Sequence, residues 1–253
     1  MRRIYLDNNV FVEIEKGNLD FSSILSWVGD ENLEIPFSAS HIQEAQNKSS
    51  NSLEERDSFL RSRFQTISEI TSNRYIYHDL EKNGMYFLSQ VPQNVYNTIN
   101  EVPAEELMRS WSNLVTIDQR KQITKDLGVD KVVNNLSSKD LLEHLDNKVS
   151  VWGNFTFEGF IDYSMNLFPS EGYGLHNRIA AVFELLDMLG YWKDKLTMNS
   201  NYARLWDSSH TNFAAYCHIF ISDDLRTRKK VKFVYDLYKI GTKIYNSKGI
   251  IES

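Results

Sequence analysis

The chain lacks features that several classes of protein require. It holds a single cysteine, Cys217, which excludes a disulfide framework and a zinc site built on thiolates. No run of about 18 uninterrupted apolar residues occurs, so the sequence predicts no transmembrane helix. Acidic residues follow soon after the first residue, where a signal peptide would have its apolar core. We therefore expect a cytoplasmic protein with no membrane partner.

Motifs for nucleotide cofactors and for a serine hydrolase are missing as well. The "GYG" at 172–174 lacks the third glycine and the preceding strand of a dinucleotide-binding loop, and there is no P-loop. No G-x-S-x-G elbow occurs, which argues against a Ser/His/Asp triad. The 253 residues are 42% hydrophobic with a net charge of -6, an ordinary globular composition that mildly disfavours nucleic acid. A local basic patch is still compatible with an acidic chain.

Short apolar stretches at both ends of the chain predict an α/β protein. Four of them are predicted as strands: "RIYLD" (3–7), "LEIPFS" (33–38), "HIFIS" (218–222) and "TKIYN" (242–246). Helical patterns lie between them, and residues 53–195 follow a helical pattern with no convincing strand. The sequence thus predicts a short parallel sheet flanked by helices, built from 1–50 and 196–253, with a large helical insertion at 51–195.

Acidic residues stand where the predicted strands end. Asp7 follows the first strand, Asp223 and Asp224 follow "HIFIS", Asp207 opens a predicted helix at 207–217, and Glu44 lies one turn into the helix after 33–38. The carboxyl ends of parallel strands meet at one edge of a sheet, so we expect these acids to converge. Hard oxygen ligands of this kind hold Mg²⁺ or Mn²⁺. The alternative is that Asp7 and Asp207 are helix caps and Glu44 is an exposed helix acid.

The first two acids resemble those of the PIN family of metal-dependent nucleases. In that family an Asp ends the first strand in a D-x-N/S/T context, matched here by "LDNN" with Asp7 and Asn9. A helical Glu follows the second strand, matched by "SASHIQEA" with Glu44. The resemblance is confined to roughly the first and last fifty residues, and the helical middle departs from a compact PIN domain.

The other two acids of the PIN pattern lie near the end of the chain. A third acid opens a helix rich in small residues, matched by "DSSHTNFAAYC" with Asp207. A fourth follows a strand ending in Thr or Ser, matched by "FISDDLR" with Ser222 and Asp224, or Asp223 in its place. The resemblance implies that Asp7, Glu44, Asp207 and Asp224 bind Mg²⁺ or Mn²⁺, supported by Asn9, Ser222 and Asp223. It also implies phosphodiester hydrolysis by metal-activated water, with RNA rather than DNA as the substrate.

A basic stretch follows the paired aspartates at once. Its cations are Arg226, Arg228, Lys229, Lys230 and Lys232. Beside a metal site they would hold the phosphate backbone of a nucleic acid. The alternative is a solvated helix face, which charge runs usually form.

Two further functional interpretations stay open. Arg204 and His210 resemble the R-x4-6-H motif of HEPN ribonucleases, which are helical and need no metal; His210, three residues after Asp207, would otherwise assist a metal site. The chain would alternatively be a PIN-like binding scaffold without catalysis. Because an unrestrained ribonuclease is hazardous to its cell, we also expect an inhibitory or activating protein partner, acting through the helical insertion.

Overall fold

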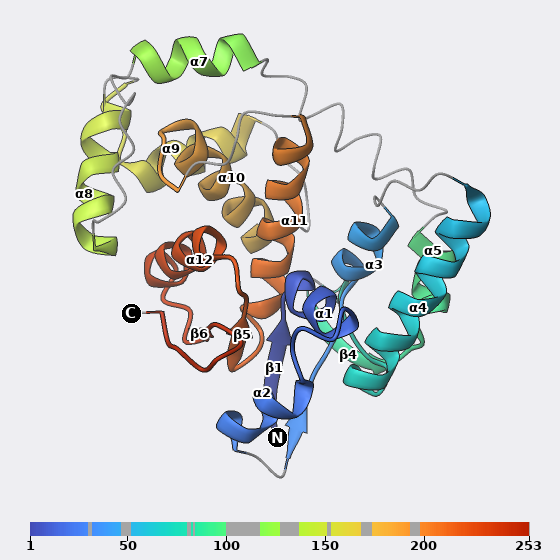
Figure 1. Ribbon diagram of the computed structural model, residues 1–253. Coiled ribbons are helices and arrows are strands. Elements are labelled where there is room, and N and C mark those ends of the chain that lie inside the picture. The colour runs from blue at the N-terminus through green and yellow to red at the C-terminus, as the bar shows by residue number, and fades with distance from the viewer. Residues whose placement is uncertain are drawn as a thin grey trace. The chain divides into compact units, whose positions relative to one another are not determined.

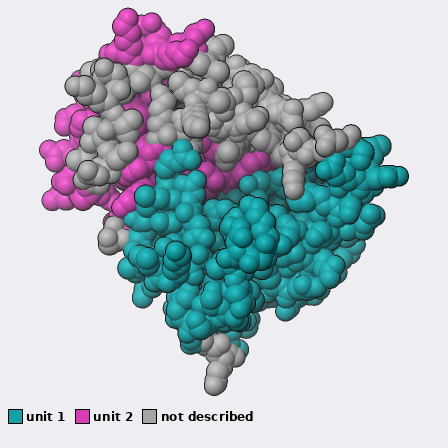
Figure 2. Space-filling model, in the orientation of Figure 1, with its two compact units in different colours: residues 1–103, 210–228, 241–253 teal, residues 104–209, 229–240 magenta. Residues whose placement is uncertain are grey.

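The computed structural model divides into two compact units. The first comprises residues 1–103, 210–228 and 241–253, and the second residues 104–209 and 229–240 (Figure 2). The first unit thus includes 51–103, which the sequence analysis assigned to the helical insertion. The structure describes residues 1–29, 32–46, 52–79, 82, 84–99, 117–126, 137–150, 153–167, 174–192 and 198–252.

A four-stranded parallel sheet forms the centre of the first unit (Figure 1). Its strands, in the spatial order β2-β1-β5-β6, are β2 (Leu33–Glu34), β1 (Arg2–Leu6), β5 (Ile219–Ile221) and β6 (Lys243–Tyr245). Ile4 pairs with Ile219 and Leu6 with Ile221, and these four side chains are buried. The prediction of an α/β chain with a short parallel sheet is confirmed.

The order of the strands reverses between β1 and β5. From β1 the chain goes to β2 on one side, and from β5 it goes to β6 on the other side. In open parallel sheets, ligands bind in the crevice at the carboxyl ends of the two strands where the order reverses. In this chain those ends are occupied by Asp7, after β1, and by Ser222, after β5.

Helices in the first unit cover the sheet through one apolar core. They are α1 (Asn8–Glu15), α2 (Phe21–Val28), α3 (Ala39–Gln46), α4 (Leu53–Thr71) and α5 (Pro92–Ile99). Phe11 from α1, Ile42 from α3 and Ile67 from α4 are fully buried in the same cluster as the strand side chains Leu6 and Ile221. This packing fixes α1 and α3 against the carboxyl end of β1.

A β-hairpin interrupts the region that the sequence analysis predicted to be helical, so the prediction of no strand in 53–195 is wrong. Strands β3 (Arg74–Asp79) and β4 (Gly84–Ser89) pair antiparallel, and Tyr75 bridges to Phe37, just after β2. The sequence "RYIYHD" carries the signal, because tyrosine and isoleucine favour strands.

The second unit is helical in its described residues. It contains α7 (Ile117–Asp126), α8 (Ser138–Val149), α9 (Phe157–Leu167) and α10 (Gly174–Met188). Two helices cross the division between the units, α11 (Met198–Ala214) and α12 (Leu225–Leu237). Four aromatic side chains of this unit would form the interaction surface of a binding scaffold. Of these, Tyr191 and Trp192 are buried, and Trp111 and Trp152 lie outside the described residues.

No helix among the described residues is both long and apolar enough to cross a membrane.

Candidate functional site

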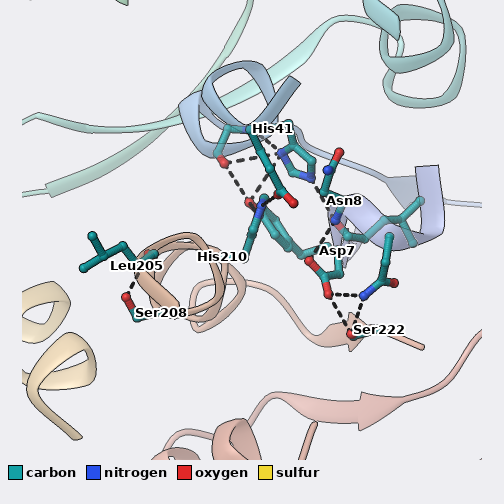
Figure 3. Close-up of polar contacts among 12 residues, drawn as sticks. Asp7, Asn8, His41, Leu205, Ser208, His210 and Ser222 are labelled. Carbon is teal, nitrogen blue, oxygen red and sulfur yellow. Dashed lines mark hydrogen bonds and ion pairs between the residues drawn. The ribbon is translucent and has the colours of Figure 1, made fainter. Parts of the chain in front are cut away.

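Asp7 is a buried carboxylate at the carboxyl end of β1 (Figure 3). It is the N-cap of α1, and its Oδ1 accepts from the backbone N–H of Asn8 at 2.8 Å. Its Oδ2 accepts from the side-chain amide of Asn9 at 2.5 Å and from the Ser222 hydroxyl at 2.6 Å. The structure therefore brings Asp7 together with the two residues that the sequence analysis named as support.

A second set of contacts holds the start of α1, next to Asp7, against α4. The guanidinium of Arg63 on α4 donates to the side-chain oxygen of Asn8 at 2.9 Å, and its other nitrogens bind Glu15 at 2.5 and 2.9 Å. Arg63 is itself buried, which makes a precise geometry necessary to offset its loss of hydration. Neither Asn8 nor Arg63 was among the predicted site residues, and nothing local in the sequence distinguishes this arginine from other helix cations.

Glu44 is connected to β1 through a buried histidine and a buried tyrosine. Its Oε2 lies 3.1 Å from His210 Nε2, and His210 Nδ1 lies 2.8 Å from the hydroxyl of Tyr5. Tyr5 lies in turn 2.6 Å from the hydroxyl of Ser38. Tyr5 and His210 have no exposed surface, whereas the side chain of Glu44 is 35% exposed. One end of this hydrogen-bonded row is therefore buried and the other reaches solvent at Glu44.

His41 ties α3 to the last residue of β1. Its Nε2 lies 2.8 Å from the carbonyl oxygen of Leu6, and its Nδ1 accepts from the backbone N–H of Ser38 at 3.0 Å. The ring also stands edge-on to that of His210, with centroids 4.6 Å apart. Although the sequence analysis missed His41, its position three residues before Glu44 on one helix was an available signal.

Electrostatics make Asp7 unusual among the described carboxylates. Burial raises the pKa of its carboxyl above the ordinary value, and the charge of Glu44 raises this pKa further. His210 and the hydrogen bonds from Ser222 and Asn8 act in the opposite direction. Burial also raises the pKa of the Tyr5 hydroxyl well above its ordinary value and lowers the pKa of His41 well below it. Tyr5 therefore keeps its proton, and His41 is neutral at neutral pH.

The two adjacent aspartates after β5 point to different partners. Asp224 caps α12, because its Oδ1 accepts from the backbone N–H groups of Arg226 at 2.7 Å and Thr227 at 3.3 Å. Asp223 Oδ1 accepts from the backbone N–H of Ser247 at 2.9 Å, and its own N–H donates to the side-chain oxygen of Asn9. The hydrogen bonds of Asp224 thus agree with the capping role, while Asp223 reaches the Asp7 loop through its backbone.

Asp207 and Arg204 belong to the second unit. Asp207 does not open a helix, because α11 already begins at Met198, so that prediction is wrong. Arg204 is buried, and its guanidinium lies 3.3 Å from Glu184 and 3.0 Å from Asp187 on α10. The partners of Arg204 are therefore acids of its own unit, and those of His210 are Tyr5 and Glu44.

The basic stretch is not a uniformly exposed row of cations. Arg228 is buried against the carboxylate of Glu252 and the carbonyl of Ser222, and Lys230 is buried with its Nζ 3.9 Å from Asp187. Burial removes both from contact with a phosphate backbone, which corrects their assignment. Lys232 pairs with Asp236 at 2.5 Å. Arg226 is exposed and Lys229 partly exposed.

The oxygens of Asp7 and Glu44 suit a hard divalent cation. A carboxylate has about four lone-pair sites, and the hydrogen bonds of Asp7 use both sites of Oδ2 but only one of Oδ1. Glu44 gives one site to His210 and is partly exposed. Mg²⁺ is commonly held by one or two carboxylates together with waters and phosphate oxygens. Among the described residues no three His, Cys, Asp or Glu side chains gather as a metal-binding group.

Comparisons of the chain with protein-family models, with curated proteins and with solved structures find no match.

Proposed function

We propose that the chain is a PIN-like, metal-dependent endoribonuclease whose Asp7 and Glu44 hold Mg²⁺ or Mn²⁺. The observation that carries the proposal is the electrostatic position of Asp7. It is buried where the strand order reverses, and its hydrogen-bond donors are neutral groups. Burial and the charge of Glu44 raise the pKa of its carboxyl, although His210 acts in the opposite direction. Two acids in this arrangement repel each other, and a cation between them would relieve that repulsion.

The residues of the chain have separate tasks in this proposal. Asn9 and Ser222 orient the Asp7 carboxylate, and His210 orients that of Glu44. The bound cation would polarise a phosphodiester and lower the pKa of a water that attacks it. Arg226, which is exposed in the first turn of α12, would contact the phosphate backbone. Asp207, Asp223 and Asp224 are not needed as ligands in this proposal, and the two remaining carboxylates match what Mg²⁺ requires of a protein.

The test is cleavage of labelled single-stranded RNA and DNA by the purified chain with Mn²⁺, with Mg²⁺ and with EDTA. We expect RNA cleavage that requires a metal. Replacement of Asp7 by Asn should reduce it about a thousandfold, because a Lewis acid contributes several kcal/mol to such a transition state. Asp20→Asn is the matched control: Asp20 caps α2 as Asp7 caps α1, and it is exposed. Asparagine caps a helix as well as aspartate does, so a difference between the two variants reports function.

Other outcomes would identify other functions. Cleavage that survives EDTA but is lost in His210→Ala would contradict the metal site and favour the HEPN-type enzyme. Retained cleavage in Asp7→Asn would refute the role of Asp7. Cleavage lost in Asp224→Asn would return Asp224 to the set of ligands. Absence of cleavage, together with absence of Mn²⁺ binding, would favour a non-catalytic scaffold.

A further inference from the structure

A tyrosine hydroxyl is fully buried in β1, where the neighbouring strand residues are apolar. Tyr5 lies in the central strand between Ile4 and Leu6 and has no exposed surface. Burying a hydroxyl costs free energy unless it is hydrogen-bonded, and a phenylalanine would fill nearly the same volume without that cost. Tyr5 contacts Ser38, at 2.6 Å, and His210, at 2.8 Å. The hydroxyl must therefore be explained by these contacts.

The direction of each hydrogen bond follows from the end at Glu44. An ionised carboxylate only accepts, so the proton shared with Glu44 belongs to Nε2 of His210. In the tautomer that carries its proton on Nε2 alone, Nδ1 is bare and accepts from the Tyr5 hydroxyl at 2.8 Å, and we assign this tautomer to His210. The Tyr5 oxygen then accepts from Ser38. Every donor in the row is used once, and all of them point toward Glu44.

We propose that Tyr5 is a positioning residue, whose hydroxyl fixes the tautomer and orientation of His210 and thereby holds the Glu44 carboxylate in place. The histidine ring is restrained at both nitrogens, at Nδ1 by Tyr5 and at Nε2 by Glu44. Without the hydroxyl, Nδ1 of His210 becomes a buried acceptor that has lost this donor. This loss favours rotation of the ring or transfer of its proton to Nδ1. The consequence for metal binding rests on the proposed function, whereas the state of the histidine ring does not.

The first measurement is the Mn²⁺ affinity of the full chain by calorimetry. Replacement of a residue that orients a ligand typically weakens metal binding about 10- to 100-fold, and we expect Tyr5→Phe to fall in this range. Tyr75→Phe is the matched control, because Tyr75 is a largely buried strand tyrosine of the same unit that lies outside this row. In a His210→Ala background Tyr5→Phe should have little further effect, because Tyr5 acts through His210. Equal affinity of Tyr5→Phe and the unaltered chain would overturn the proposal.

The second measurement is the nitrogen-15 spectrum of the histidine rings, with His210 identified from the His210→Ala variant. We expect a protonated Nε2 and a bare Nδ1 in the unaltered chain, and a mixture of tautomers in Tyr5→Phe. An unchanged His210 signal in that variant would also overturn the proposal. If the unaltered chain binds no Mn²⁺, the metal assignment fails, and the nitrogen-15 spectrum alone then decides whether Tyr5 positions His210.

Discussion

Each unit of the chain buries an aspartate, and the two differ in how the charge is compensated. In the second unit, Asp187 of α10 lies 3.0 Å from the guanidinium of Arg204 and 3.9 Å from Nζ of Lys230. In the first unit, Asp7 accepts hydrogen bonds from a backbone N–H, an amide and a hydroxyl, all of them neutral. Both side chains are almost completely buried. A difference in burial therefore does not explain the difference between them.

The two aspartates differ in whether nearby cations balance the buried charge. The charge of a buried carboxylate that faces cations is compensated within the protein and requires no bound ligand. The pKa of the Asp7 carboxyl is raised above its ordinary value chiefly by burial and then by Glu44, and the opposing effects of His210 and of the neutral donors do not cancel this rise. Carboxylates with pKa values perturbed in this way concentrate at functional sites. The charge of a buried aspartate is therefore compensated differently in the two units, and three measurements test this contrast.

The largest expected effect on stability is at Asp187. Its replacement by Ala leaves Arg204 and Lys230 buried without this partner, and loss of one member of a buried ion pair costs about 3–5 kcal/mol. We expect Asp7→Asn to cost far less, because its partners are neutral. Urea unfolding followed by far-UV circular dichroism measures both. Equal destabilisation by the two substitutions would contradict the distinction between the two aspartates.

The second prediction concerns stabilisation by a divalent cation. A ligand that binds only the folded chain adds about 2.7 kcal/mol at a concentration of 100 times its Kd. Mn²⁺ should therefore raise the free energy of unfolding of the unaltered chain and of Asp20→Asn, but not of Asp7→Asn. Stabilisation that is independent of Asp7 would place the cation elsewhere.

The third prediction is a pH dependence of stability that belongs to Asp7. Because its folded-state pKa is raised above the ordinary value of 3.8, its stabilising contribution is fully present below that value. This contribution is lost as pH rises through the raised pKa, at about 1.4 kcal/mol for each pH unit by which the pKa is raised. In EDTA, the unaltered chain should lose stability relative to Asp7→Asn between acid and neutral pH. A difference that is constant with pH, in urea unfolding at several pH values, would contradict the raised pKa.

Much of the sheet and part of the site were predictable from the sequence. The strands β1, β5 and β6 are short apolar runs that end at polar residues, and this local pattern indicates a buried strand without knowledge of its neighbours. The positions of Asp7 and Ser222 follow, because they are the residues next to two neighbouring parallel strands. The role of Asn9 was also predictable, because Asn9 lies two residues after Asp7 and its side-chain amide reaches the Asp7 carboxylate.

The remaining parts of the site depend on contacts that are distant in the sequence. The partners of Tyr5, namely Ser38 and His210, lie 33 and 205 positions away, and no local pattern joins them. A histidine and a tyrosine inside apolar segments look like ordinary core residues. Asp207 was misplaced for the opposite reason, because an Asp followed by two serines matches a helix start although α11 continues through it. Cap patterns indicate that a helix is able to start, and tertiary packing decides whether it does.

The smallest expected effect is at the surface of the basic stretch, where Arg226 is exposed and Arg228 is buried. Arg226 is exposed, with one carboxylate oxygen of Asp224 at 3.7 Å, so Arg226→Ala should change the free energy of unfolding by less than about 0.5 kcal/mol. If Arg226 contacts RNA, the same substitution should reduce the slope of log affinity against log salt by about 0.7, the value for one phosphate of a single strand.

Arg228 is buried against Glu252 and Ser222, so Arg228→Ala should instead lower stability without a specific change in that slope. Filter binding of single-stranded RNA at several salt concentrations, in EDTA to prevent cleavage, measures the slope. An unchanged slope for Arg226→Ala would leave the exposed cation as a solvated part of α12, and the metal site would then have to hold its substrate without it.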